Sequence, residues 1–389
     1  MKIAVIGIKG IPSEMGKIER YCQEFYPRIA EKGHQVDLFV QPSPNQRLWF
    51  SVDYYRNTRV IALAILFIKQ PGFMLNAALS TVWASLGSYD VIHIQGTKAA
   101  WFSWFAQLFS KSKIVLTSHE LNSHENCERG HKVLNCLSSW MERAAVKNAD
   151  EVIVVSKALK KYFQRKYNIA PRYIPSAPRN YDSINMGFDY GKSLGLRSKR
   201  YILSLSKFNA KKRPEILIKA FQKLQLTGWK LVLAGEISDS LEYTAKLLYL
   251  TKRSPNIIFA NQIDGQNLAE IIHHAALLVE TSEGANLGLS TNVLEAMQQK
   301  VPVLASDRLI YRELIGRNRG LLFQEGCFDS LLRQLQFASS EPERLRNLAQ
   351  AAHTYITVNH NWDRVTYGNL SSYLRVTDKI NDQSFQHNA

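Results

Sequence analysis

Short apolar runs alternate with longer amphipathic segments along most of the chain. The first runs cover residues 2–7 and 35–40, and the segment between them, about 18–32, has the spacing of an amphipathic helix that ends at Gly33. Such alternation is typical of βαβ units and predicts a parallel sheet. The other predicted strands of the first half are residues 90–94, 113–117 and 151–155.

A second series of the same kind follows residue 200. Residues 176–200, between the two series, are rich in polar and turn-forming residues, as an interdomain linker is. The pattern therefore predicts an α/β protein with two doubly wound domains in tandem. The second series has predicted strands at 201–205, 230–234, 256–259, 275–279 and 301–305, and predicted helices at 215–224, 240–251, 265–275 and 293–299.

The length of 389 residues also exceeds the size at which a single hydrophobic core stops growing. We therefore expect two domains joined by a linker. Their expected bounds are 1–178 for an N-terminal Rossmann-like domain, 179–199 for the linker, 200–360 for a C-terminal Rossmann-like domain, about 361–376 for a helix able to pack back on the first domain, and 377–389 for a polar tail.

Polar residues follow the predicted strands of the first domain. Gln95 to Thr97 follow one strand, Ser118 to Glu120 the next, and Ser156 a third. Because ligands of open α/β sheets bind beyond the carboxyl ends of the strands, these residues are expected to converge on a binding crevice. His119 is therefore a candidate functional residue, although a lone histidine is often only a satisfied polar group. A cleft between the domains would place the two crevices face to face.

The stretch Thr281 to Ser306 organises the second domain, since it contains a strand end, a loop with two glycines, and a helix start. The free N–H groups and the positive end of a helix favour an anion. Glu283 and Glu295 flank this start, where carboxylates are suited to hold hydroxyl groups. Two alternatives stay open: Asn292 and Glu295 also fit a capping-box pattern, and Glu283 also fits a solvated loop carboxylate.

Cations follow the first strand of the second domain, in S-K-F-N-A-K-K-R-P. Lys207, Lys211, Lys212 and Arg213 are a suitable counterion set for a diphosphate, and ordinary surface lysines are the alternative. The glycines near the N-terminus do not have the spacing of a dinucleotide-binding fingerprint.

The net charge of +16 indicates polyanionic partners, such as phosphorylated ligands, an anionic membrane surface or nucleic acid. A nucleic-acid-binding module is absent from the sequence, so we expect no nucleic-acid partner. Five cations concentrate on one helical run, which is either a membrane-facing surface or a solvated face. They are Lys157, Lys160, Lys161, Arg165 and Lys166.

No apolar run has the length of a membrane span, and the chain enters its first strand without a signal-like segment. We therefore expect a cytoplasmic location, with peripheral attachment to the inner face of a membrane as an option. The four cysteines form no C-x-x-C pair, and His119, His124, Cys127 and His131 lie close together without a known metal-ligand spacing. We expect no metal and no cofactor.

Several segments resemble retaining nucleotide-sugar glycosyltransferases of family 4. They are G-I-K-G-I-P followed by G-K-I-E-R, D-V-I-H-I-Q-G, T-S-H-E, V-I-V-V-S-K-A-L-K and L-E-A-M-Q-Q-K-V-P-V-L-A-S, the last being the most specific. The similarity spans almost the full length, and the opening segment most resembles the rhamnosyltransferase-like branch of cell-surface polysaccharide enzymes. The resemblance implies the GT-B fold, in which an acceptor-side domain faces a nucleotide-sugar-binding domain across a cleft.

The resemblance also implies transfer of a hexose or deoxyhexose from a nucleoside diphosphate sugar to a hydroxyl acceptor, with retention at the anomeric carbon. The expected partners are the nucleotide-sugar donor and a saccharide or lipid-linked saccharide acceptor. Within this resemblance, His119 contacts the transferred sugar, Glu283 holds sugar hydroxyls and Glu295 holds ribose hydroxyls. The family's two glutamates usually lie closer together, and here Leu287 occupies the position of the first.

The remaining implied contacts go to the donor diphosphate. Gly16 lets the backbone approach it, and Lys207 and Lys212 bind it. Lys17 stands where the family commonly has a second glycine. An alternative function is therefore a catalytically silent relative that binds a nucleotide sugar or a partner enzyme. The helix start contributes N–H groups to the same phosphates through Ser290, Thr291 and Asn292.

Overall fold

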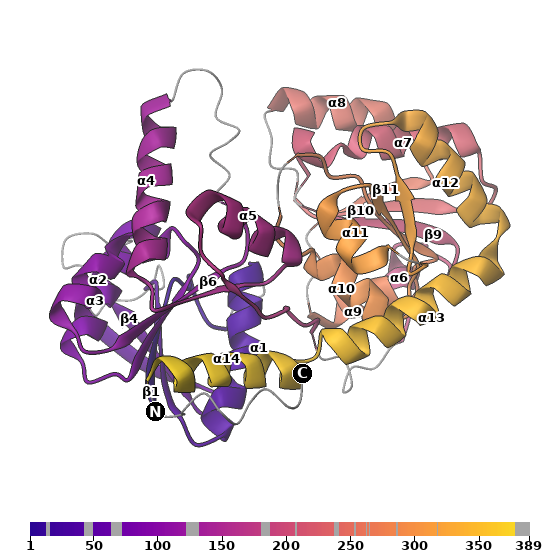
Figure 1. The fold of residues 1–389 in the computed structure, drawn as a ribbon. Helices are drawn as coiled ribbons and strands as arrows, with labels where there is room; N and C mark the ends of the chain where they lie inside the picture. Colours follow the sequence, from indigo (N-terminus) through magenta and orange to yellow (C-terminus); the bar gives the residue numbers. More distant parts are fainter. Residues whose placement is uncertain are drawn as a thin grey trace. The chain divides into compact units, whose positions relative to one another are not determined.

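A computed structural model describes most of the chain. The described residues are 1–12, 16–42, 50–63, 72–121, 132–179, 187–206, 208–236, 241–252, 254–261, 263, 265–284, 287–316 and 318–377, without the side chains of 132–138. The chain divides into two compact units (Figure 1). Unit 1 comprises residues 1–177, 286–289 and 361–389, and unit 2 comprises residues 178–285 and 290–360.

Unit 1 contains an eight-stranded sheet in the order β3-β4-β2-β1-β5-β6-β7-β8. Neighbouring strands are parallel except β3 and β4, which form an antiparallel pair at one edge. The strands are β1 (Lys2–Ile6), β2 (Gln35–Val40), β3 (Phe50–Tyr55), β4 (Thr58–Leu63), β5 (Val91–Gln95), β6 (Lys113–Ser118), β7 (Glu151–Val154) and β8 (Arg172–Tyr173).

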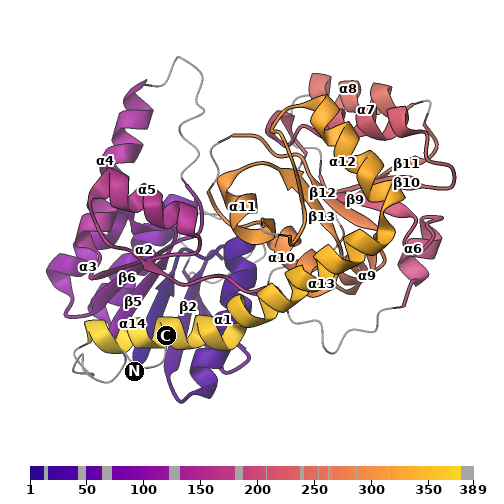
Figure 2. The same ribbon diagram turned by 45° about the vertical axis from the view of Figure 1, so that its right-hand side comes forward.

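The helices of unit 1 form two contiguous groups. Helix α14 (Trp362–Val376) lies alongside α1 (Lys17–Glu31), as both views show (Figures 1 and 2). The second group contains α2 (Phe73–Leu86), the 3₁₀ turn η1 (Ala99–Phe102), α3 (Ser103–Phe109) and α4 (Lys132–Asn148), which contact one another. Helix α5 (Lys157–Tyr167) contacts β7 and β8.

Alternation along the strands explains how one sheet serves both groups. Ile3 and Val5 point to the same side and join a buried cluster with Phe25 of α1 and Tyr373 of α14. The intervening residue Ala4 points to the other side and is also fully buried. Central parallel strands are therefore apolar on both faces, which is why they were readable as continuous apolar runs.

Unit 2 contains a six-stranded sheet in the order β11-β10-β9-β12-β13-β14, with every pair parallel. Its strands are β9 (Tyr201–Leu205), β10 (Lys230–Ala234), β11 (Ile257–Ala260), β12 (Leu277–Glu280), β13 (Val303–Ser306) and β14 (Leu321–Phe323). Its helices are α6 (Asp189–Ser193), the 3₁₀ turn η3 (Ala210–Lys212), α7 (Pro214–Leu224), α8 (Leu241–Thr251), α9 (Gly265–His273), α10 (Thr291–Gln298), α11 (Leu309–Ile315), α12 (Phe328–Ser340) and α13 (Pro342–Asn359).

The two Rossmann-like α/β units confirm the predicted fold class. Within residues 179–199, expected to be a linker, α6 forms and packs on α9, and the backbone N–H of Gly191 donates to Glu270 Oε1 at 2.7 Å. The edge hairpin β3–β4 was not predicted, and the middle of β3, from Val52 to Tyr54, is exposed. In the described part of the chain, no helix is both long enough and apolar enough to span a membrane.

Burial of Phe25 gives a test of the unit 1 core. Its ring is fully buried and contacts the rings of Tyr21 and Tyr26. We expect Phe25→Ala to lower the free energy of unfolding of unit 1 by about 3–5 kcal/mol, because removing a core aromatic leaves a cavity. Urea unfolding followed by tryptophan fluorescence measures this change. Tyr54→Ala, at a position 77% exposed, is the control, and equal losses in both variants would contradict the packing described.

Candidate functional site

The carboxyl ends of the central strands of unit 1 lie together. Gly7, just after β1, has a φ of +99°, and a Cβ placed there would approach the carbonyl oxygen of Gln95 to 2.4 Å. Only glycine fits such a contact without a shift of the backbone. Gln95 ends β5 and is fully buried, and Gly96 N–H donates to the carbonyl of Thr117 in β6 at 2.8 Å. The predicted convergence of the strand ends in unit 1 is therefore present.

His119 follows β6 at this edge. Its side chain is buried, and its ring meets the ring of Tyr21 of α1 edge-on, with centroids 4.9 Å apart. Its Nε2 lies 2.7 Å from Gln95 Oε1. Because the amide of Gln95 donates through Nε2 to Tyr26 OH at 2.5 Å, its Oε1 accepts, so His119 carries its proton on Nε2. The ring orientation and tautomer of His119 are thus set by a neighbouring strand.

The hydrogen bonds continue beyond Gln95 to the C-terminal helix. Tyr26 OH lies 2.9 Å from Nδ1 of His93, and Tyr373 OH lies 2.6 Å from the same atom. Nε2 of His93 lies 2.7 Å from Thr117 Oγ1. A continuous chain of buried polar groups therefore links α14 to His119, and networks of this kind are rigid when every member is paired.

Both histidines are held neutral. Burial, together with the positive charge of Lys17, lowers the pKa of His119 to about 3. Burial also lowers the pKa of His93 to about 3, with a smaller contribution from His119. At neutral pH, His119 can donate through Nε2–H and accept through Nδ1, but it cannot serve as a cationic group.

Gly16 occupies the N-cap position of α1. Its φ is +93°, and a Cβ there would meet the carboxylate of Glu19 at 1.9 Å. That carboxylate is buried and accepts from the backbone N–H of Lys9 at 3.1 Å, which ties the glycine loop to the helix start. Gly16 therefore gives the loop a conformation that a residue with a side chain would disturb.

Residues 287–289 pack within unit 1. Ser156 Oγ, at the start of α5, donates to the carbonyl of Leu287 at 2.7 Å. A Cβ on Gly288 would approach the carbonyl oxygen of His119 to 2.4 Å, so this glycine allows a close backbone approach. The second glycine of the loop that follows β12 is thus placed beside the histidine.

In unit 2, the loops that follow β9 and β12 are bound to each other. Thr281 Oγ1 donates to the carbonyl of Lys212 at 2.5 Å, and Lys212 Nζ donates to Ser282 Oγ at 3.0 Å. The backbone N–H of Glu283 donates to the carbonyl of Lys211 at 2.8 Å. Lys212 is therefore positioned at the carboxyl edge of the sheet, where the sequence placed it. Lys207 lies outside the described residues.

Glu283 lies at the same edge in an ion pair. Arg213 Nη1 lies 2.9 Å from each of its carboxylate oxygens, and Arg213 Nε donates to Glu215 Oε1 at 2.7 Å. The side chain of Glu283 remains 26% exposed. Its carboxylate keeps lone pairs for hydroxyl groups, but Arg213 restricts where it points. The sequence suggested Arg213 as a counterion, and here its partner is Glu283.

Helix α10 starts with Ser290 as N-cap and Thr291 as its first residue. The capping-box alternative does not hold, because Asn292 is inside the helix and its amide donates to the carbonyl of Leu205 at 2.7 Å. This bond connects the helix start to the end of β9. Glu295 lies one turn further and is buried, with 2% exposure. The amino end of α10 is thus placed beside the loop that carries Lys212.

Glu280 is a residue that the sequence reasoning missed. It ends β12 and is buried, and it accepts from Ser282 Oγ at 3.2 Å, Ser290 Oγ at 3.4 Å and Tyr311 OH at 3.3 Å. Burial, together with the negative charge of Glu280, raises the pKa of Tyr311, so the phenol stays a donor. Glu280 ties the strand end to the helix start. A carboxylate that ends an apolar strand run was the signal that could have indicated it.

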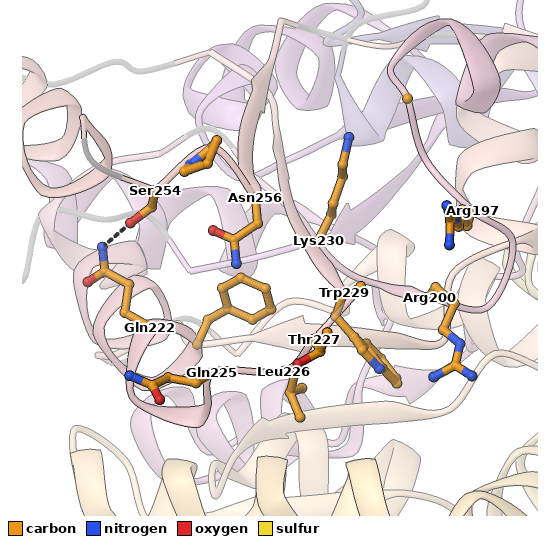
Figure 3. Close-up of a pocket in the computed structure, with 14 residues that line it drawn as sticks. Arg197, Arg200, Gln222, Gln225, Leu226, Thr227, Trp229, Lys230, Ser254 and Asn256 are labelled. Atoms are coloured by element: carbon orange, nitrogen blue, oxygen red, sulfur yellow. Dashed lines mark hydrogen bonds between the residues drawn. The ribbon is translucent and has the colours of Figure 1, made fainter.

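Unit 2 also has a cavity of about 870 Å³ at the opposite edge of its sheet (Figure 3). It lies near the amino ends of β9, β10 and β11, and Arg200 and Lys230 line it together with Trp229. Gln222 donates to Ser254 Oγ at 2.8 Å on its wall. Because binding sites of α/β sheets form at the carboxyl edge, we assign the candidate site to the loops of β9 and β12 and not to this cavity.

The described residues contain no group of three His, Cys, Asp or Glu side chains that could hold a metal ion. Three of the four residues in the cluster near His119, namely His124, Cys127 and His131, lie outside the described residues.

Family models account for both halves of the chain. Residues 18–178 match the model of glycosyltransferase family 4, and residues 190–355 match that of glycosyl transferases group 1. The chain belongs to the glycosyltransferases. This glycosyltransferase is 24% identical over 334 residues to an uncharacterized glycosyltransferase of Methanocaldococcus jannaschii, an alignment that covers 79% of this chain and 80% of the relative.

Solved structures with the GT-B fold resemble this glycosyltransferase over nearly all of its length. Sucrose-phosphate synthase from Thermosynechococcus elongatus has a TM-score of 0.79 at 19% identity, with 97% of this chain and 100% of the other covered. Anabaena HepE, in complex with UDP-glucose, has a TM-score of 0.73 at 17% identity, with 98% and 100% covered. At these identities, the similarity shows the shared fold.

The lowered pKa values of His93 and His119 predict how stability depends on pH. Both titrate near 6.5 when unfolded and near 3 when folded, so between these values the unfolded chain binds more protons. The free energy of unfolding should therefore fall as the pH drops from 7 to 5, by up to about 1.4 kcal/mol per pH unit for each histidine.

Urea unfolding at several pH values measures this slope. His119→Gln keeps a donor for Gln95 and removes one titrating group, so its slope between pH 5 and 6 should be smaller by about 1 kcal/mol per pH unit. An unchanged slope in this variant would show that His119 is not held neutral in the folded protein.

Proposed function

We propose that this glycosyltransferase moves a hexose or deoxyhexose from a nucleoside diphosphate sugar to a hydroxyl acceptor, with retention at the anomeric carbon. The observation that carries the proposal is the joint placement of Lys212 and the amino end of α10 at the carboxyl edge of the unit 2 sheet. A cation and a helix start beside each other match the two charges of a diphosphate.

The chemistry requires a diphosphate to leave the anomeric carbon. Negative charge grows on the departing oxygen, and Lys212 and the N–H groups of α10 would stabilise it. In the retaining reaction that the family resemblance implies, the leaving phosphate takes the acceptor's proton on the same face of the sugar. No carboxylate then acts as a nucleophile, and the protein contributes positioning and charge stabilisation. The proposed reaction assigns no step to a metal or cofactor.

Similar structures support a nucleotide-sugar donor. Anabaena HepE is described with UDP-glucose, and the catalytic domain of starch synthase IV from Arabidopsis thaliana with ADP and acarbose. We infer a donor of the same class for this chain. Glu295, buried one turn into α10, is the proposed ribose contact, and Gly16 is the proposed point of backbone approach to the diphosphate.

His119 is proposed to contact the transferred sugar as a neutral group. With Nε2–H bound to Gln95, its Nδ1 is the atom that accepts a hydrogen bond from a sugar hydroxyl. The role is positioning, since a ring with a pKa of about 3 is neutral near pH 7 and is not available as an imidazolium acid. Glu283, held by Arg213, is proposed to bind further hydroxyls of the same sugar.

The opening G-I-K-G-I-P segment supports a role in cell-surface polysaccharide or glycolipid synthesis, with a saccharide or lipid-linked saccharide as acceptor. We propose a cytoplasmic enzyme that works peripherally at the inner face of a membrane. The cationic face of α5 supports this location, because Lys161 and Arg165 are exposed. Lys166 contributes less, since it pairs with Glu142 at 3.4 Å.

A catalytically silent relative is the second candidate. Two observations favour it: Glu283 is already engaged by Arg213, and Lys17 replaces the family's second glycine next to Gly16. Such a protein would bind a nucleoside diphosphate sugar, or a partner enzyme, without turnover.

Lys212→Ala tests the proposed function. Removing a cation that stabilises the leaving diphosphate should lower kcat/KM by about 10²-fold, on the scale of a lost oxyanion contact. Lys212→Arg should retain part of the activity, because the charge is kept with a different geometry. Release of nucleoside diphosphate from a panel of donors measures turnover, and product NMR gives the anomeric configuration.

Lys223→Ala is the matched control, since this exposed lysine lies in the last turn of α7, the helix that follows the 3₁₀ turn containing Lys212. Equal turnover of Lys212→Ala and the native chain with every donor would show that the diphosphate site is elsewhere. Thermal shifts with UDP, ADP, GDP and dTDP separate the two candidates: binding without turnover supports the silent relative.

A further inference from the structure

Helix α2 of unit 1 has its polar side buried and its apolar side exposed. Its buried residues are small or polar: Asn76, Ala77, Ser80, Thr81, Ala84 and Ser85. The opposite face exposes large apolar side chains, namely Leu75, Val82, Trp83 and Leu86, the last at 77%. A surface helix of a globular protein normally has the reverse arrangement. The exposed face of α2 is therefore suited to contact with an apolar environment.

Helix α3, which contacts α2, repeats this arrangement. Its buried residues are Ser103 and Ala106, and it exposes Trp104, Leu108 and Phe109. The rings of Phe105 and Phe109 pack 4.5 Å apart, so the aromatic side chains hold each other in place. The two helices lie side by side in both views of the fold (Figures 1 and 2).

Small buried residues explain how the inversion is tolerated. Ser85 Oγ donates to the carbonyl of Thr81 at 2.6 Å, and Thr81 Oγ1 to that of Ala77 at 2.7 Å, so these two buried hydroxyls are satisfied within the helix. The buried hydroxyl of Ser80 has no hydrogen-bond partner among the described residues. Asn76 donates to the carbonyl of Val40 at 3.2 Å at the end of β2. The inner face of α2 therefore packs through small side chains, whereas the large side chains of Leu75, Trp83 and Leu86 are exposed.

Among the described residues, most exposed charges that border this face are positive, and Asp150, two residues after α4, pairs with Lys113 at 3.6 Å. Neither α2 nor α3 contains a charged residue. Lys111 is exposed two residues after α3, and α4, which contacts α3, exposes Arg143 and Lys147 together with Trp140. Glu142, on the same helix, is buried and paired with Lys166. An apolar face with tryptophans and a cationic border suits the interface of an anionic bilayer.

We propose that the exposed faces of α2 and α3 are the surface through which this chain docks on an anionic lipid membrane, with the aromatic side chains entering the headgroup region. The inference rests on the proposed work at a membrane, and it assigns the main contact to α2 and α3 and a supporting electrostatic role to α5. Exposed large apolar side chains on two helices that contact each other are typical of an interaction surface.

Vesicle co-sedimentation of the full-length protein tests the proposal. Vesicles of phosphatidylcholine with phosphatidylglycerol should retain the native chain, and phosphatidylcholine alone should retain it less. Leu108→Ser/Phe109→Ser should weaken retention at least about tenfold, because two exposed apolar side chains no longer enter the interface. Both residues are exposed on α3, at 70% and 60%, and because Phe109 packs on Phe105, circular dichroism and thermal unfolding check that the variant is folded.

Unit 2 offers a matched control pair. Leu248→Ser/Tyr249→Ser changes the same kinds of side chain on α8, at 51% and 80% exposure, and should leave retention unchanged. The proposal would be overturned if the native protein did not bind anionic vesicles. It would also be overturned if the α3 variant were retained as well as the native protein, or if the α8 variant lost retention. A native dimer that the α3 change dissociates, seen by sedimentation velocity, would assign this face to a second copy instead.

Thermal shifts without vesicles measure nucleotide binding. The α3 variant should bind UDP, ADP, GDP and dTDP in the same way as the native chain. This measurement separates the two proposals. A native chain that binds no nucleoside diphosphate would contradict the proposed function, whereas a native chain that binds nucleotide but no anionic vesicles would contradict the docking surface alone.

Discussion

The parallel pairing of β9 with β12 is the constraint on which the candidate site of unit 2 depends. It places two loops, far apart in sequence, at one edge, where Thr281 and Lys212 bind each other's loop and Asn292 attaches the start of α10 to the end of β9. Glu280 adds to this arrangement by accepting hydrogen bonds from Ser282, Ser290 and Tyr311. A helix start and a cation are therefore fixed before any ligand arrives, which lowers the entropy cost of binding.

Unit 1 uses a different means for the same end. Its candidate residue, His119, is held by a buried chain of hydrogen bonds and not by loop-to-loop contacts. Burial also removes the charge of the imidazole, so the group offers shape and hydrogen bonds but no cation.

The sequence could predict much of this arrangement because buried parallel strands are read as apolar runs, and polar residues after such runs mark the crevice edge. β9 and β10 were predicted at their observed bounds for this reason. Side-chain partners could not be predicted from the sequence, because they depend on tertiary contacts. Examples are the pairing of Arg213 with Glu283 and the hydrogen bond between His93 and Tyr373, which are 280 residues apart. Helices α2 and α3 were missed because each has alanine on its buried side and large apolar residues on its exposed side, so no polar face contrasts with an apolar one.

The position of α14 has a consequence for biosynthesis. Val365 and Tyr373 belong to the core of unit 1, although residues 178–285 and 290–360 of unit 2 are translated before them. During translation, α14 cannot pack on α1 until the whole second half of the chain has been synthesised. Until then, the apolar residues of α1 that α14 covers stay exposed. Completion of unit 1 is then the last event in synthesis, and a nascent chain stalled before residue 361 would expose Tyr21, Phe25 and their neighbours to chaperones.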